Sequence, residues 1–244
     1  MDTSSKKIKF ISKIKNFSNF FLDLIFPKYC VGCNKEGVWL CQKCKNLIIV
    51  IKKSFCASCQ KLTPKGQYCS KCRQKYYLTG VIIAAHYEKK CVLKEAVHTY
   101  KYDHIKNLKY ALAPLLINAL YHRNFSKNLI ILPVPLSKQR IKQRGYNQSE
   151  ELAKVVAIKT SSKLITKKLI RIKNKTRQAD LPRAKRLENI KGVFDWIGKN
   201  ELKNKRVFLI DDVYTTGATV NECAKVLRQK AKAREVWAVV LGKG

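Results

Sequence analysis

The chain has 244 residues, of which 46% are hydrophobic and 27% charged, so it can bury a sizeable core and wholesale disorder is excluded. Its 51 Lys and Arg residues against 16 Asp and Glu residues give a formal net charge of +35. Such a charge attracts polyanions, namely nucleic acid, phosphorylated small molecules or an anionic membrane face. The basic residues are spread along the whole chain, so a Lys-rich composition bias explains the charge equally well.

Residues 1–26 are predicted to form a basic amphipathic leader helix that ends before Pro27. Apolar residues recur at helical spacing from Ile8 to Ile25, with lysines on the other face. Such a helix packs on the body of the protein or lies on a membrane surface, and packing is the favoured role. The segment has no small-residue cleavage site and no run of ~18 uncharged apolar residues, so we expect neither a signal peptide nor stable membrane insertion.

Eight of the ten cysteines form four C-x-x-C pairs within residues 27–78, a segment with too few apolar residues to build its own core. One C-x-x-C turn places two thiolates beside a metal, and a second turn completes a tetrahedral set. The spacing therefore predicts a double zinc ribbon with one or two structural Zn2+ ions that hold this segment in its fold. The predicted metal ligands are Cys30, Cys33, Cys41, Cys44, Cys56, Cys59, Cys69 and Cys72.

The cysteine pattern leaves two alternatives open. Sequential pairing of the C-x-x-C turns is the simplest arrangement, but interleaved pairing is compatible with the same spacing. Iron–sulfur clusters usually have tighter spacings, and a redox dithiol needs one pair rather than four. Because we expect no secretory signal, the thiols indicate metal binding in a cytoplasmic protein rather than disulfides. Cys91 and Cys223 are predicted to be ordinary small apolar residues.

Residues 79–244 alternate between predicted strands and helices. The predicted strands are 81–85, 129–134, 164–172, 206–210 and 235–242. The predicted helices are 93–123, broken near Asp103 and disturbed at Pro114, then 149–160 and 218–232, with a basic loop over 173–192. Unbroken apolar runs such as 129–134 are typical of strands that are covered on both faces. The alternation predicts a doubly wound α/β domain with a mostly parallel sheet.

Two adjacent carboxylates, Asp211 and Asp212, follow the predicted strand 206–210, and a turn rich in hydroxyl groups then opens a helix. Backbone N–H groups and hydroxyls at such a helix start bind phosphate, and open α/β sheets bind ligands at this edge. The turn residues are Thr215, Thr216, Gly217, Ala218 and Thr219. The carboxylates would repel a phosphate unless they bind sugar hydroxyls, with Mg2+ nearby. The alternative is that Asp212 only caps the helix.

This string resembles, position for position, the 5-phosphoribosyl 1-diphosphate (PRPP) signature of type I phosphoribosyltransferases. The resemblance implies that Asp211 and Asp212 are catalytic residues that hold the ribose hydroxyls. It also implies that residues 215–219 bind the 5-phosphate. Some family members have an Asp in the place of Thr215 that serves as general base, so the threonine leaves both the base and the acceptor open.

A second motif follows the predicted strand 129–134. In the same family the loop after this strand contacts pyrophosphate, and a mobile segment with bidentate arginines would suit a diphosphate. The resemblance therefore assigns PRPP binding to Pro135, Leu136, Ser137, Arg140 and Arg144. The alternative is an exposed basic loop in which Asn147 or Ser149 caps the next helix.

The combined pattern resembles the ComF family of competence proteins, of the ComFC type. It comprises the tandem cysteine pairs, Tyr100-Lys101-Tyr102, the PVPL and RGYNQS motifs, the spaced group Arg171, Arg177, Gln178, Arg186 and Asn189, and the DDV-x-TTGAT string. The resemblance runs from about Phe26 to Leu241. It implies a double zinc ribbon fused to a phosphoribosyltransferase-like domain, connected with uptake and processing of single-stranded DNA in natural transformation.

Three functions follow as hypotheses. The first is a PRPP-binding, Mg2+-dependent phosphoribosyltransferase of unknown acceptor that acts on or beside DNA, with proteins of the DNA-uptake machinery as further partners. The second is a catalytically inactive module that binds single-stranded DNA through its charge and through Tyr100, Tyr102 and Tyr110, unless these rings only pack helices. The third is a nucleobase salvage transferase, for which the sequence shows no recognisable base-binding loop.

Overall fold

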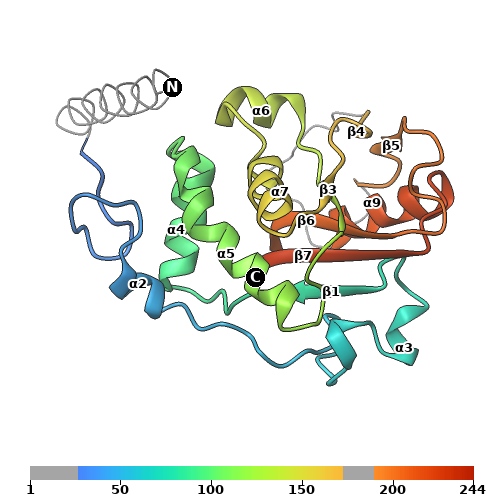
Figure 1. Cartoon of the computed structure of the whole chain (residues 1–244), viewed down its shortest axis with the longest axis horizontal. Coiled ribbons are helices and arrows are strands. Elements are labelled where there is room, and N and C mark those ends of the chain that lie inside the picture. Colours follow the sequence, from blue (N-terminus) through green and yellow to red (C-terminus); the bar gives the residue numbers. More distant parts are fainter. Residues whose placement is uncertain (1–26, 173–189) are drawn as a thin grey trace, which may run out of the picture.

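The computed structural model describes residues 27–172 and 190–244. The predicted leader helix of residues 1–26 lies outside the described residues, as do Arg177, Gln178, Arg186 and Asn189 of the basic loop. Within the described ranges, no helix has the length and apolar character that a membrane span requires. These ranges form two cysteine-containing ribbons and an α/β unit (Figure 1).

Five parallel strands form the central sheet in the order β1-β7-β6-β2-β3. They are β1 (Gly80–Ile83), β2 (Ile130–Pro133), β3 (Lys163–Leu164), β6 (Arg206–Tyr214) and β7 (Glu235–Lys243). The long strands β6 and β7 are buried over most of their length, which explains their continuous apolar sequence. The predicted mostly parallel sheet is confirmed.

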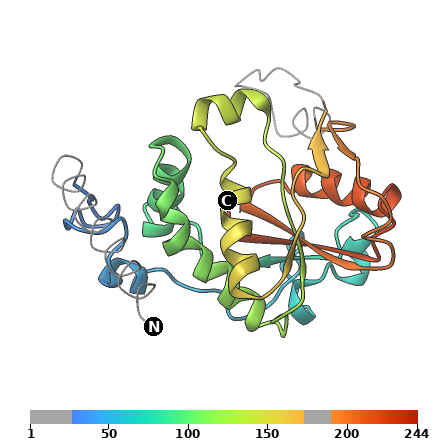
Figure 2. The ribbon, with the colours of Figure 1, turned by 45° about the horizontal axis from the view of Figure 1, so that its top comes forward.

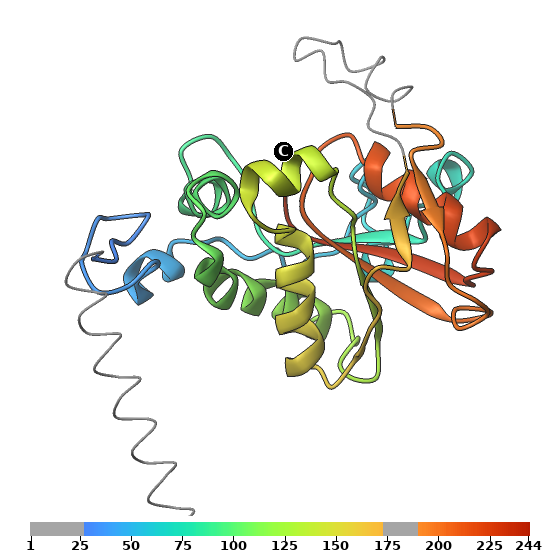
Figure 3. The same cartoon turned by 90° about the horizontal axis from the view of Figure 1, so that it is seen from above.

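Helices cover both faces of this sheet. One face is covered by α4 (Val92–Tyr102), α5 (Lys109–Tyr121) and α7 (Gln148–Lys159), whose apolar side chains pack with Phe208 and Trp237. The other is covered by α9 (Ala218–Gln229) and by the antiparallel pair of β4 (Leu169–Arg171) and β5 (Phe194–Trp196). Figure 3 shows these layers on opposite sides of the strands. The predicted doubly wound α/β architecture is confirmed.

The two ribbons lie at different places on this unit. The first ribbon, residues 27–46, includes α2 (Gln42–Asn46) and packs against the start of α4, where a Cβ on Gly32 would be only 3.2 Å from Val92 Cγ1. The second ribbon, residues 55–78, includes the 3₁₀ turn η1 (Pro64–Gly66) and α3 (Ser70–Arg73) and packs on the α9 face. Figure 2 shows the first ribbon at the left and α9 at the right.

Residues 47–54 connect the ribbons and run along the outer edge of β1. The Ile51 N–H donates to the Ala84 carbonyl at 2.8 Å, and the His86 N–H donates to the Ile49 carbonyl at 2.9 Å. The second ribbon extends this pairing, since the Tyr68 N–H donates to the Thr79 carbonyl at 3.0 Å. The connection is therefore part of the fold rather than a free linker.

Several predicted elements need adjustment. The predicted strand 164–172 is divided between β3 and β4, which belong to different sheets and are separated by Lys167 at φ +61°. The predicted strand 206–210 continues to Tyr214, so the acidic pair lies inside β6. The helical region breaks after Tyr102, as predicted, but α5 continues through Pro114, where the ring removes one backbone hydrogen bond.

The segment after β2 was predicted as a mobile loop, and this prediction was wrong. Residues 138–144 form the helix α6 (Lys138–Arg144). Ser137 caps its first turn by accepting a hydrogen bond from the Arg140 N–H at 3.3 Å, and Gly145 ends it in the left-handed region at φ +74°. A polar helix of this length has little apolar periodicity, which explains why the pattern of hydrophobic residues did not reveal it.

Candidate functional site

The eight C-x-x-C cysteines gather in two groups of four, in sequential order: Cys30, Cys33, Cys41 and Cys44, then Cys56, Cys59, Cys69 and Cys72. Within each group all sulfurs lie within 4.8 Å of one another, and all ten cysteines of the chain are free thiols. Zinc with sulfurs at about 2.3 Å requires S–S separations of about 3.8 Å. The Cys33–Cys41 and Cys59–Cys69 sulfur distances are 3.7 and 3.6 Å. Each group therefore fits a closed tetrahedral zinc site.

Backbone amides around the sulfurs favour the thiolate form that zinc binds. Burial alone raises the pKa of Cys30, but N–H groups of Cys41, Gly32 and Cys33 directed at its sulfur lower it to about 6. The Cys41 N–H lies 3.3 Å from the Cys30 sulfur. Burial also raises the pKa of Cys56, and backbone amides again outweigh burial and lower this pKa to about 7. Another cysteine of each group has a raised pKa, about 12 for Cys44 and about 11 for Cys72, so each group holds thiols of both kinds before zinc binds. Two sites of four cysteines are typical of structural zinc ribbons.

The acidic pair lies near the carboxyl end of β6, and three side chains from the helical layer converge on it. Gln148 Nε2 donates to Asp212 Oδ2 at 2.8 Å, and Ser149 Oγ donates to Asp211 Oδ1 at 2.8 Å. Lys101 Nζ, from the last turn of α4, lies 2.9 Å from Asp212 Oδ1. The RGYNQS motif and the Tyr-Lys-Tyr motif, far apart in the sequence, thus meet at the two carboxylates.

Burial shapes the electrostatics of the pair. Asp212 is only 5% exposed. Burial raises the pKa of Asp211 to about 7, and the adjacent Asp212 charge acts in the same direction against the opposing Ser149 hydrogen bond. Asp212 keeps its counter-ion, Lys101, in direct contact. The site therefore has one carboxylate paired with a cation and one that gains a proton more readily than an exposed aspartate.

The turn that follows β6 has the form expected of an anion-binding helix start. Gly217 adopts φ +77° at the N-cap of α9, and Thr215 is exposed while Thr216 and Thr219 are half-buried. The Ala218 N–H donates to Thr216 Oγ1 at 3.3 Å, and the first intrahelical bond of α9 runs from the Asn221 N–H to the Gly217 carbonyl. The N–H groups of Thr219 and Val220 precede that bond, so they face the start of the helix. The alternative of an Asp212 helix cap is wrong, because Gly217 occupies that position.

A tyrosine pair connects this turn with the second ribbon. A Cβ on Gly217 would lie 2.2 Å from the Tyr214 hydroxyl, so only glycine allows this approach. The Tyr214 hydroxyl is 2.9 Å from that of Tyr68, the residue before Cys69, and both rings are buried. Asn221 Oδ1 also accepts a hydrogen bond from the Tyr77 N–H at 2.7 Å. The second ribbon therefore contacts both sides of the helix start.

The middle motif is only partly placed as predicted. Asn147 caps α7 by accepting from the Ser149 N–H at 3.1 Å, as one alternative expected, and Pro135 and Leu136 follow β2 beside this cap. Arg144 is not on a mobile loop: it is 5% exposed, with its guanidinium 5.0 Å from the Tyr102 ring centre. Arg140 lies half-buried on the first turn of α6. The two arginines are thus held by a helix, which corrects the predicted exposed segment.

The proposed stacking tyrosines separate into two kinds. Tyr100 is fully buried and donates its hydroxyl to the Gln148 carbonyl at 2.9 Å, so it packs helices and cannot stack a base. Tyr102 and Tyr110 are 45% and 63% exposed.

Contacts between distant residues were missed at the sequence level. Lys101, Gln148 and Ser149 were identified as motif members, but their spacing did not connect them with the acids. The Tyr68–Tyr214 pair was not identified at all. Nothing in the local pattern points to contacts between residues so far apart in the chain.

Similarities to known proteins agree with this arrangement. Residues 21–73 match the Double zinc ribbon domain family. Competence protein F of Haemophilus influenzae is 29% identical over 209 residues, covering 78% of this chain and 90% of that protein. Competence protein ComFC of Bacillus subtilis is 36% identical over 110 residues, covering 45% and 42%. The DNA utilization protein YhgH of Escherichia coli K12 is 27% identical over 225 residues, covering 88% and 97%.

Among solved structures, a hypoxanthine phosphoribosyltransferase from Staphylococcus aureus shares 15% identity, with a TM-score of 0.33 over 64% of this chain and 73% of that chain. That likeness is too distant to support a conclusion beyond the sheet order described above. The fold and the cysteine groups define a double zinc ribbon joined to a doubly wound α/β domain with a parallel sheet. The relatives that match over most of its length are competence and DNA utilization proteins, so the chain is similar to the proteins of the ComF family.

Proposed function

We propose that the chain binds PRPP with Mg2+ and acts as a phosphoribosyltransferase. The observation that carries the proposal is the acidic pair of β6, which three side chains from α4 and α7 hold beside a glycine-containing helix start. In this proposal the turn 215–219 binds the 5-phosphate at the positive end of α9. Asp211 and Asp212 accept hydrogen bonds from the ribose hydroxyls.

The remaining contacts assign supporting roles. Asp212 has partners on both carboxylate oxygens, so a ribose hydroxyl reaches it only by replacing Lys101 or Gln148. Lys101, Gln148 and Ser149 are therefore positioning residues that hold the acids before the sugar arrives. Mg2+ prefers carboxylate and phosphate oxygens, and when bound it balances the charge on the leaving pyrophosphate. Arg140 and Arg144 add cationic donors on α6 near that leaving group.

Calorimetric titration of the zinc-loaded protein with PRPP and Mg2+ tests the proposal. Wild type is expected to bind with measurable heat. Asp212→Asn should lose at least about tenfold in affinity, since it removes the charged acceptor of a buried, hydrogen-bonded site. Asp195→Asn is the matched control, because that carboxylate pairs with Lys230 instead. No heat with wild type, or equal losses in the two variants, would contradict PRPP binding.

The names of the relatives support a second role, association with single-stranded DNA during competence or DNA utilisation. The observations that favour it are the net charge of +35 and the exposed rings of Tyr102 and Tyr110, with Lys109 Nζ 5.1 Å from the Tyr110 ring centre. Binding through phosphates must weaken steeply with salt. A fluorescence titration with an oligonucleotide at low and moderate salt tests this, and an affinity that barely changes would exclude phosphate contacts as its basis.

A further inference from the structure

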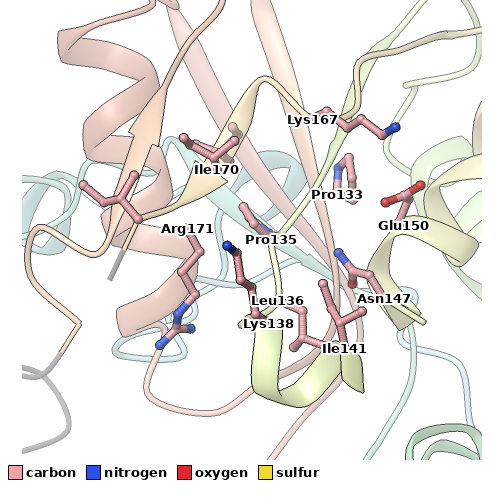
Figure 4. A pocket seen from close by; sticks show the side chains of 12 residues that line it. Pro133, Pro135, Leu136, Lys138, Ile141, Asn147, Glu150, Lys167, Ile170 and Arg171 are labelled. Atoms are coloured by element: carbon pink, nitrogen blue, oxygen red, sulfur yellow. The ribbon is translucent and has the colours of Figure 1, made fainter. Parts of the chain in front are cut away.

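A pocket of about 550 Å³ opens beside the carboxyl end of β2. Its walls come from the end of β2, the helix α6, the start of α7 and the strand β4, as Figure 4 shows. The lining residues are Pro133, Pro135, Leu136, Lys138, Ile141, Asn147, Glu150, Lys167, Leu169, Ile170, Arg171 and Ile172. The resemblance assigned two of these residues, Pro135 and Leu136, to PRPP binding, but no motif in the sequence identified the pocket with its β4 wall.

The charged groups of the pocket favour an anion. Lys138, Lys167 and Arg171 come from three different elements, and Glu150 is the one carboxylate among the lining residues. In Figure 4, Lys138 stands in the middle of the lining, with Arg171 on one side and Glu150 and Lys167 on the other. The Glu150 carboxylate is already paired with Lys154, whose Nζ lies 2.9 Å from Glu150 Oε1, so the three cations leave a net positive charge that attracts a phosphate group.

The apolar groups of the pocket favour a ring. Pro133, Pro135, Leu136, Ile141 and Ile170 present hydrocarbon to the cavity. Inorganic pyrophosphate and a bare sugar phosphate offer no apolar surface that would gain from contact with these side chains. A ligand that combines a phosphate with a planar ring matches both halves of the lining, and a nucleotide is the common biological molecule of that kind.

The pocket shares a wall with the acidic pair. Asn147 lines the pocket, and its neighbours Gln148 and Ser149 hold Asp212 and Asp211. Asn147 Nδ2 also donates to the Val134 carbonyl at 3.1 Å, which fixes the start of α7 against the end of β2. A ring in this pocket would therefore lie next to a sugar held by the two carboxylates.

We propose that this pocket binds a nucleotide unit, either free or within a single strand, as the acceptor of the phosphoribosyl group. This inference rests on the proposed PRPP binding. In the transfer, the bond between C1 of the ribose and the pyrophosphate oxygen breaks, and pyrophosphate leaves with the electron pair. A nucleophilic nitrogen or oxygen of the nucleotide forms the new bond to C1 and releases its proton to water.

Calorimetry on the full, zinc-loaded chain without PRPP tests the site. A nucleoside monophosphate should bind at least about tenfold more tightly than ribose 5-phosphate or pyrophosphate, because only the nucleotide carries the ring. Lys138→Gln should weaken nucleotide binding about fivefold or more, whereas Lys142→Gln, an exposed position on the same helix, should not. Equal affinities for the three ligands, or equal losses in the two variants, would overturn the proposal.

Two further measurements separate the alternatives. If a 5′-phosphorylated trinucleotide binds more tightly than the monophosphate, with the same Lys138 dependence, the ligand of the pocket is a nucleotide within a strand. If the trinucleotide binds more weakly, the ligand is a free nucleotide. Titration of the same wild-type sample with PRPP reports on the proposed function separately. Nucleotide binding without PRPP binding would keep the pocket and exclude the transfer, and PRPP binding without nucleotide binding would exclude this acceptor.

Discussion

The two ribbons have the same four-cysteine ligand set but different neighbours. The first packs against the start of α4, and α4 contacts the acidic pair through Lys101 in its last turn. The second contacts the residues on either side of the turn 215–219, through the Tyr68–Tyr214 hydroxyl pair and through Asn221 of α9. Identical metal chemistry thus supports two separate parts of the molecule, the helical layer on one side and the candidate phosphate site on the other.

Removal of one zinc ligand from each ribbon should give the largest difference between the two ribbons. Cys56→Ser and Cys30→Ser both remove a buried sulfur, and each should lower the zinc content by about one ion per chain. We expect Cys56→Ser to reduce PRPP affinity at least about tenfold, because the second ribbon fixes the helix start, whereas Cys30→Ser should change it less than about threefold. Elemental analysis and calorimetry on the same samples measure both quantities; equal losses of affinity would show that the ribbons do not differ in this way.

Acid should weaken the contact between α7 and α5, because the carboxylate of Glu151 joins these two helices. Burial would raise the pKa of Glu151, but hydrogen bonds and charges from Lys109 and Lys154 outweigh burial and hold its pKa at about 2. Because this pKa is below the ordinary value of 4.5, the ion pairs stabilise the fold above pH 4.5 and lose this effect as the pH falls towards 2.

Glu151→Gln should therefore lower the free energy of unfolding by about 1–3 kcal/mol at neutral pH, because it leaves Lys109 without its carboxylate. The difference from wild type should shrink as the pH falls from 4.5 to about 2. Urea unfolding of both proteins across this range measures the effect. Loss of zinc in acid affects both proteins alike and cancels in the difference, and a deficit that stays constant over the whole range would contradict the assignment.

The smallest expected effect comes from the tyrosine pair. Tyr68→Phe leaves the buried Tyr214 hydroxyl without this partner and should cost about 1 kcal/mol of stability. PRPP affinity should fall a few-fold, since Tyr214 supports Gly217. Tyr76→Phe is the matched control: its ring stacks on Tyr68 at 4.1 Å, but its hydroxyl bonds to Ser58 in an exposed position. Urea unfolding and calorimetry that give the same values for both variants would exclude a specific connection.

Local sequence patterns predicted the features that depend on neighbouring residues. The C-x-x-C spacing indicated metal sites of four cysteines, with the sequential order that the structure shows as the simplest arrangement, and the unbroken apolar runs indicated the buried parallel strands. The break at Asp103 was also correct. In each case a few consecutive residues are enough to predict the feature.

The features that were missed depend on contacts between distant residues or on weak local signals. Lys101 and Asp212, or Tyr68 and Tyr214, are brought together by the order of the strands, which one sequence does not contain. Tyr100 was considered for base stacking because the sequence does not show that its ring packs against α7. That packing, which buries the ring, is visible only in the structure. The helix α6 had its cap signals, Ser137 and Gly145, but no apolar stripe to draw attention to them.

The segment between the ribbons has a consequence for the exposed rim of the sheet. Its hydrogen bonds to Ala84 and His86, with that of Tyr68 to Thr79, lie just before and just after β1, at the rim of the sheet beyond β1. A strand left open at that side would offer itself to another polypeptide. We therefore expect that a chain shortened to the α/β unit alone would begin with an uncovered β1 and would associate with itself more readily than the full chain.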